Sequence, residues 1–214
     1  GWTATDTLTV SNFFANVYLP ATYVSSPSVG VLGPSNKGAL QMSGALACAV
    51  FNDNTNLFNQ ILYLYQTSAS CGLHNNCGSS GEMGETGRDQ GHADDDVLQM
   101  AFCAEVFWDQ GMDGYSEDDN RLLACGEYYA RNNLPPGAQY ITYGTTDYIY
   151  WNNSTNAGGS SAGGIYTSEP MMGNILRSAY VVRKGLTAPW MVLKRNATPS
   201  ANGVAGAQSE NMDS

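Results

Sequence analysis

The chain has 214 residues, a charged fraction of 13% and a formal net charge of −10, and this length accommodates one domain with a sizeable core. Phosphate binding needs clustered Lys and Arg, so this charge argues against nucleic acid as a partner. The sequence contains no apolar run of about 18 residues, and we therefore expect no membrane span.

The surface composition and the sequons favour a secreted, extracellular protein. Gly, Ser, Thr and Asn are abundant, and the chain begins with Gly1 rather than Met, which predicts a processed mature chain or a fragment. The sequons at Asn152, Asn153 and Asn196 predict glycosylation during passage through a eukaryotic secretory pathway.

The first periodic segments, residues 38–51 and 56–67, predict two helices joined by the turn NDNT, and hence an antiparallel helical hairpin. The expected apolar stripes are Leu40, Gly44, Ala47 and Phe51 on the first helix and Leu57, Ile61, Leu64 and Tyr65 on the second.

A second hairpin is predicted downstream. Residues 92–108 carry an apolar stripe at helical spacing, and residues 118–133 form its partner helix, which ends before Pro135. The stripe of the first helix consists of Val97, Met100, Ala101, Ala104 and Trp108. The similarity of CAVFNDN to CAEVFWDQ indicates a hairpin repeated every ~55 residues, so stacked helical hairpins are the simplest architecture.

The remaining segments differ from these hairpins in composition and periodicity. Residues 137–168 are rich in Gly, Ser, Thr and aromatic residues without a helical period, which predicts a functional loop. A last helix spans 169–185, with Pro170 in its first turn and Gly185 at its end. We predict an all-α fold with one domain over residues 1–196 and a polar, poorly ordered tail over 197–214.

Five cysteines cannot all pair within one chain. Cys71 and Cys77 flank a short loop and are the expected disulfide, whereas Cys48, Cys103 and Cys125 are buried thiols or include one pair that bridges neighbouring helices. The absence of a CxxC or paired Cys/His spacing argues against a zinc site.

The segment GRDQGH, residues 87–92, is the main candidate site. His92 lies beside a predicted helix start, where unsatisfied N–H groups favour an anionic ligand, and Arg88 and Gln90 can donate to the same carboxylate. The alternative is structural: His92 caps the helix, and Arg88 pairs with Glu85 or Asp89.

Other polar clusters admit two interpretations each. Asp94–Asp96 and Glu117–Asp119 resemble calcium ligands or paired catalytic carboxylates, but both fall in expected first turns and lack EF-hand spacing, so we expect no metal. His74 is expected at the surface. The tyrosines suit sugar stacking or proton transfer, and also ordinary packing. They are Tyr140, Tyr143, Tyr148 and Tyr150.

Several segments together resemble the alginate-lyase-type polysaccharide lyases, which fold as an α/α toroid. The similarity spans roughly residues 33–190 and includes ETGRDQGH, FWDQGMDGY and DNRLLACGEYYARNN. SNKGALQMSGALACAVF matches the family's upstream helix and places its Asn at position 36, and EPMMGNILRSAYVVRKGLTAPW matches a later helix. Lys37, Ala93 and the sequence RSAY depart from the family pattern.

The resemblance implies a stacked-hairpin, incomplete toroid that cleaves a polyuronate, such as alginate or glucuronan, by β-elimination without metal or cofactor. Asn36 and His92 would neutralise the substrate carboxylate, with Arg88 as reinforcement. A tyrosine would shuttle the proton, with Tyr148 preferred over Tyr143 and Tyr180 third. Gln90, Arg177 and Tyr180 are the further substrate-binding candidates.

Two alternatives stay open. The chain is a non-catalytic carbohydrate-binding relative, which the RSAY departure favours, or a glycoside hydrolase on an α/α scaffold. The hydrolase would use paired carboxylates among Glu85, Asp89 and Asp94–Asp96.

Overall fold

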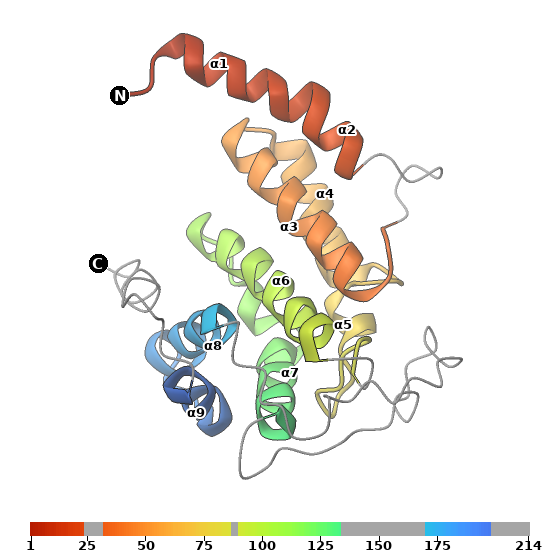
Figure 1. Ribbon diagram of the computed structural model, residues 1–214, viewed down its shortest axis with the longest axis vertical. Coiled ribbons are helices and arrows are strands. Elements are labelled where there is room, and N and C mark those ends of the chain that lie inside the picture. Colours follow the sequence, from red (N-terminus) through yellow and green to blue (C-terminus); the bar gives the residue numbers. More distant parts are fainter. Residues whose placement is uncertain (24–31, 87–89, 134–169, 198–214) are drawn as a thin grey trace.

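The computed structural model describes residues 1–23, 32–86, 90–133 and 170–197. Of these residues 76% are helical and none lies in a strand, which confirms the predicted all-α class (Figure 1). The helical segments are α1 (Ala4–Phe13), η1 (Phe14–Tyr18), α2 (Leu19–Thr22), α3 (Ser35–Phe51), α4 (Thr55–Thr67), α5 (Leu73–Asn76), α6 (Gln90–Asp109), η2 (Gly114–Ser116), α7 (Glu117–Asn133), α8 (Pro170–Leu176), η4 (Arg177–Arg183) and α9 (Pro189–Ala197).

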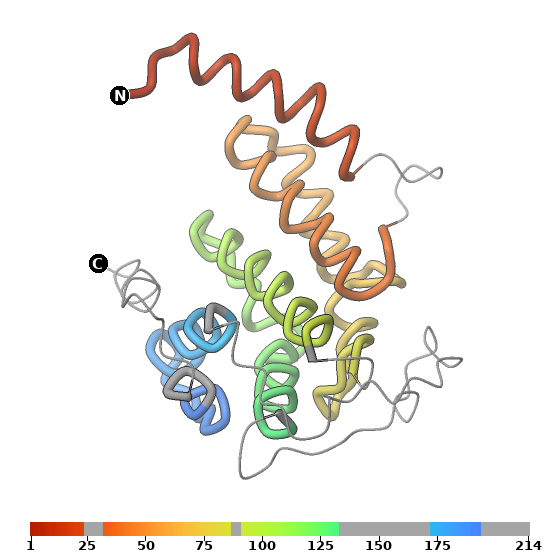
Figure 2. The backbone as a smooth tube through the Cα atoms, viewed as in Figure 1, coloured from red at the N-terminus to blue at the C-terminus, as the bar shows by residue number. Residues whose placement is uncertain are grey.

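The first three segments run end to end as an arm that lies along α3, as the tube in Figure 2 shows. Thr3 begins the arm with a capping box, because its hydroxyl accepts from the backbone N–H of Asp6 while its own N–H donates to that carboxylate. The structure describes every residue from Ala4 to Thr22, and none of these side chains is buried. The Gln41 side chain of α3 donates to the carbonyl of Thr22 at 3.0 Å and ties down the end of the arm.

The arm explains why the predicted apolar stripe of α3 is wrong. Leu40 is 54% exposed and Phe51 39% exposed, and the ring of Phe51 packs edge-on against those of Trp2 and Phe14. The hydroxyl of Tyr18 lies over Gly44. The face buried in the core is offset from this stripe and consists of Ala39, Met42, Ala45, Leu46 and Ala49.

Both predicted hairpins are present. The α3–α4 pair packs against α6, and α6 packs against its partner α7. In α4 the predicted stripe is correct, since Ile61 and Tyr65 are fully buried, and Phe58 and Tyr65 contact the ring of Phe107 edge-on. In α6 the predicted residues Val97, Met100, Ala101 and Ala104 are all buried, so the 3.6-residue period identified this face correctly.

The start of α7 departs from the regular helix that the sequence predicts. Asp118, Asp119 and Asn120 have φ of 49°, 59° and 61°, which is the left-handed region that Asp and Asn tolerate best among non-glycine residues. Arg121 stabilises this turn by pairing with the Asp118 carboxylate at 2.7 Å. Regular α7 therefore begins after these residues.

The C-terminal part packs on the other side of α6 and α7. The predicted helix over 169–185 corresponds to α8 and the π-helical η4, and Gly185 ends it with φ of 64°. Arg183 anchors η4 through a bidentate ion pair with the buried Glu105 of α6, at 2.8 and 2.6 Å. The carboxylate of Glu127 caps α9 by accepting from two backbone N–H groups, those of Trp190 and Met191.

The predicted functional loop over 137–168 and residues 198–214 of the predicted tail lie outside the described residues. Across the segments that the structure describes, no helix has the length and apolar character needed to cross a membrane.

Candidate functional site

The candidate site is built at the N-terminal ends of α3 and α6. Ser35 begins α3 with φ of 46°, and its N–H donates to the carbonyl of Ser70 at 2.9 Å. Its hydroxyl donates to the Asn76 side chain of α5 at 2.9 Å. Gly84 lies directly over it, and a Cβ at Gly84 would collide with the Ser35 hydroxyl. These contacts fix the backbone from which Asn36 projects.

Asn36 is held against α6. Its amide Nδ2 donates to Oδ2 of Asp95 at 3.3 Å, and the residue is only 8% exposed. The other carboxylate oxygen of Asp95 accepts from Nε2 of Gln99 at 3.0 Å, and Oε1 of Gln99 accepts from the hydroxyl of Ser43 at 2.7 Å. Two side chains of α3, separated by two helical turns, therefore contact one face of α6.

His92 lies on the same helix as Asp95, in the first turn of α6, and is half-buried. Residues three and four apart on a helix are surface neighbours, with Cβ atoms about 5–6 Å apart. The Asn36 amide is thus bonded to a residue of α6 that lies one helical turn after His92. The structure brings together the segments that carry these two residues, and their catalytic roles stay predictions.

The acidic run of α6 is placed differently from the prediction. Because α6 begins at Gln90, Asp94–Asp96 follow the first turn, and Asp94 and Asp96 are fully buried instead of solvated. Oδ1 of Asp96 accepts from Nδ2 of Asn76 at 2.7 Å. Burial raises the pKa of Asp96 well above its ordinary value, the Asn76 hydrogen bond opposes this shift, and the nearby Glu85 charge adds to it.

Glu85 is also buried, at 1% exposure. Of the carboxylates that the hydrolase alternative would use, Glu85, Asp94 and Asp96 are therefore buried in this structure. Asp89 lies outside the described residues.

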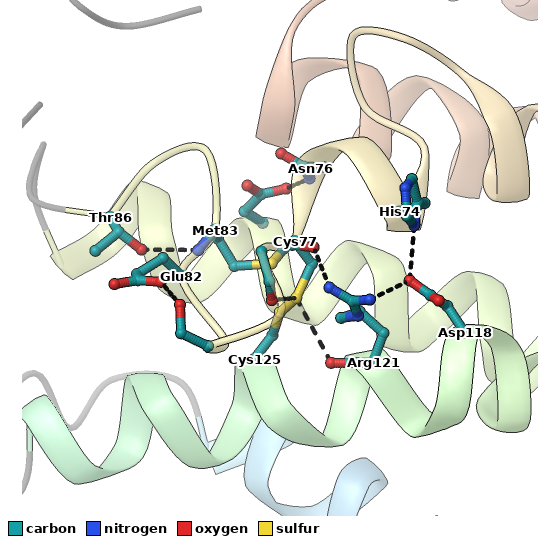
Figure 3. The surroundings of a disulfide bond; sticks show 12 residues. His74, Asn76, Cys77, Glu82, Met83, Thr86, Asp118, Arg121 and Cys125 are labelled. Carbon is teal, nitrogen blue, oxygen red and sulfur yellow. Dashed lines mark hydrogen bonds and ion pairs between the residues drawn. A yellow bond between two sulfur atoms is a disulfide. The ribbon is translucent and has the colours of Figure 1, made fainter. Parts of the chain in front are cut away.

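The predicted disulfide between Cys71 and Cys77 is wrong. Cys77 is bonded to Cys125 of α7, with Cα atoms 6.4 Å apart (Figure 3). Cys71 is a buried thiol that lies against Ser68 and Gly38, and burial raises its pKa to about 11. Sequence proximity favoured the short loop, but Cys77 follows α5 and faces α7. Cys48 and Cys103 are buried thiols, whereas Cys125 is neither a free thiol nor paired with one of these two, as the two alternatives predicted, because it is bonded to Cys77.

The surroundings of this disulfide include the second histidine. His74 is exposed as predicted, with 66% of its side chain accessible, and Asp118 accepts from its Nδ1 at 2.9 Å. Arg121 contacts the same carboxylate and also donates to the carbonyl of Cys77 at 3.4 Å, as Figure 3 shows.

Tyr180, which the sequence predicts to bind substrate, lies in the core. It is fully buried, its hydroxyl donates to the carbonyl of Tyr115 at 2.8 Å, and its ring packs edge-on against that of Tyr115. Burial raises its pKa far above that of a free phenol. The helical period of η4 points this residue to the core, and the sequence prediction gave too little weight to packing.

Three other predicted residues lie within described helices. Arg177 is half-buried at the start of η4, and Gln90 is the first residue of α6. Asn196 lies within α9, but the structure does not describe its side chain. The predictions that fall outside the described residues are those for Arg88, Tyr140, Tyr143, Tyr148, Tyr150, Asn152 and Asn153.

Sequence reasoning missed the residues that support Asn36. Asp95 and Gln99 lie three and seven positions after His92, a spacing that puts them on its face of α6. That spacing was a usable signal for Asp95, whereas Ser35 and Asn76 carry none, because their contact joins residues 41 positions apart.

Comparison of the sequence with protein-family models gives no match, and comparison with curated proteins gives none either. The resemblance to the lyases therefore rests on the sequence motifs alone. Within the described segments no group of three His, Cys, Asp or Glu side chains is arranged to hold a metal ion.

Proposed function

We propose that this protein is a secreted polysaccharide lyase that cleaves a polyuronate, such as alginate or glucuronan, by β-elimination on an incomplete α/α toroid. The observation that carries the proposal is the docking of the Asn36 amide on α6, one helical turn from His92. An amide donor and an imidazole from two different hairpins suit one carboxylate ligand.

The chemistry needs such donors. The C5 proton of a uronate is weakly acidic, and its removal leaves enolate-like charge on the adjacent carboxylate. Donors that are already oriented stabilise this charge without reorganisation during the reaction. Asn36 and His92 supply them, Arg88 reinforces them, and Tyr148 or Tyr143 takes the C5 proton and protonates the leaving O4.

The overall charge of −10 is compatible with a polyanionic substrate because recognition is local. The attraction comes from a few local donors, and the substrate therefore associates with the protein more slowly than it would with a positively charged one. The disulfide and the sequons support a secreted glycoprotein.

The test is incubation with a panel of polyuronates while ultraviolet absorbance from unsaturated ends is followed. We expect absorbance to rise on at least one polymer, and Asn36→Ala and His92→Ala to lower kcat about 100-fold or more, as loss of an oxyanion donor does. His74→Ala is the matched control, because this second histidine is exposed and contacts α7. Flat traces on every polymer refute the lyase, binding without turnover indicates the carbohydrate-binding alternative, and products without a double bond indicate hydrolysis.

A further inference from the structure

We propose that Asp95 is a positioning residue that fixes the orientation of the Asn36 carboxamide, so that a second N–H of Asn36 is presented to the substrate carboxylate. This inference rests on the proposed function, and one of its two readouts does not need catalysis. Asp95, in the acidic run of α6, would thus orient a neighbouring side chain, a role distinct from solvation and from metal binding.

The chemistry of the pair selects one orientation of the amide. The two ends of an Asn carboxamide are nearly isosteric, and a rotation of about 180° exchanges a donor for an acceptor. An ionised carboxylate only accepts, so Asp95 binds the Nδ2 end of Asn36, at 3.3 Å, and excludes the reverse orientation. The second N–H of this nitrogen then points away from Asp95 and is available to a ligand.

Asp95 is itself held in place. Gln99 donates to its other oxygen at 3.0 Å, and Gln99 in turn accepts from Ser43 at 2.7 Å. Gln99 lies one turn beyond Asp95 on α6, and Ser43 lies two turns beyond Asn36 on α3. The chain of contacts Asn36–Asp95–Gln99–Ser43 therefore fixes the carboxylate from both helices.

Oδ1 of Asn36 adds an independent observation. This atom is buried and accepts no hydrogen bond from the residues that the structure describes. No contact at that end of the carboxamide holds it against rotation, so Asp95 provides the hydrogen bond that defines its orientation. In a variant without Asp95, the carboxamide can turn, and its donor no longer faces the charge that develops on the substrate carboxylate during the reaction.

Three variants separate orientation from charge. Asp95→Ala removes the acceptor, and we expect kcat to fall about tenfold with KM within twofold, because a misplaced donor acts mainly on the transition state. Asp95→Asn keeps an acceptor for Asn36, and rotation of the Gln99 amide restores its partner, so we expect kcat within about twofold of the wild type. His74→Ala lies outside this chain of contacts and, as the matched control, should retain wild-type kcat.

The second readout is nuclear magnetic resonance of the Asn36 side-chain amide in the full chain without substrate, with its signal assigned through Asn36→Gln. We expect one of its two protons to be shifted downfield and protected from exchange in the wild type and in Asp95→Asn, but not in Asp95→Ala. An amide signal that is unchanged in Asp95→Ala overturns the inference. So does an equal loss of kcat in Asp95→Ala and Asp95→Asn.

The two readouts distinguish the two proposals. A wild-type protein that cleaves no polyuronate but shows the Asp95-dependent amide signal refutes the lyase and supports the positioning role. An active wild type with an Asp95→Ala variant of unchanged kcat supports the lyase and refutes the positioning role.

Discussion

Removal of the Cys77–Cys125 disulfide should be the most destabilising single covalent change in this chain. The bond joins residues 48 positions apart and links the end of α5 to the middle of α7. In the chain-entropy model, a cross-link that closes a loop of this length stabilises the folded state by about 4 kcal/mol. The expected disulfide between Cys71 and Cys77, six positions apart, would contribute only about 2 kcal/mol in the same model.

The assay is urea unfolding followed by circular dichroism, on the wild type and on the double variant Cys77→Ala/Cys125→Ala. We expect the double variant to lose about 4 kcal/mol of unfolding free energy, and its Tm to fall by about 8–16 °C for a chain of this size. A reducing agent should lower the stability of the wild type by a similar amount and leave the double variant unchanged.

Cys71→Ala is the matched control, because Cys71 is buried near the disulfide and is a free thiol. This variant should stay as sensitive to the reducing agent as the wild type. The reasoning fails if Cys71→Ala abolishes that sensitivity, or if reduction changes the unfolding free energy of the wild type by less than about 1 kcal/mol. Peptide mapping without reduction identifies the bonded pair directly.

For three further substitutions, the structure predicts whether the unfolding free energy rises or falls. Arg183→Met leaves the Glu105 carboxylate buried without its ion pair and should cost about 3–5 kcal/mol in urea unfolding, much of which replacement of Glu105 by Leu in the same chain should recover. Gly84→Ala should cost about 1–3 kcal/mol, and less when Ser35 is also changed to Gly, because the added Cβ collides with the Ser35 hydroxyl. Asp96→Asn tests pH dependence. The folded-state pKa of Asp96 is raised, so its contribution to stability is complete below about pH 4 and is lost as pH rises through the folded pKa. The variant should therefore gain stability relative to the wild type as pH rises, and a pH-independent difference in unfolding free energy would contradict this assignment.

Periodicity predicted the elements whose buried face is made of large side chains. In α4 and α6 the apolar residues recur at helical spacing, and the core faces around Ile61 and Val97 follow directly. In α3 the period is ambiguous, because Gly and Ala occur on several faces. On the face of α3 that carries Phe51, rings of the N-terminal arm pack against that residue, and sequence reasoning did not predict that arm.

The missed features all depend on contacts between distant segments. Cys77 pairs with a residue 48 positions away, and Ser35 with one 41 positions away, so local spacing carries no information on either contact. The left-handed turn at Asp118–Asn120 also has a distant contact, because His74 bonds to the Asp118 carboxylate, and Arg121 adds a local contact to the same group. A first-turn acidic run is a sound expectation for an isolated helix, and tertiary packing overrides it here.

One face of α6 connects the candidate site to α3 and α5. His92, Asp95, Asp96 and Gln99 follow the spacing i, i+3, i+4, i+7 and so share that face. Asp95 binds α3 through Asn36, and Asp96 binds α5 through Asn76. The hydrogen bond from Ser35 to Asn76 then connects α3 and α5. A carboxylate accepts from amides in a fixed sense, so these two acids set the register of α3 against α6 and the direction in which the Asn36 donor points. The oxygens of Asp95 and Asp96 thus accept from amides of α3 and α5, and this arrangement is compatible with the proposed role of the second Asn36 N–H as a donor to an anionic substrate.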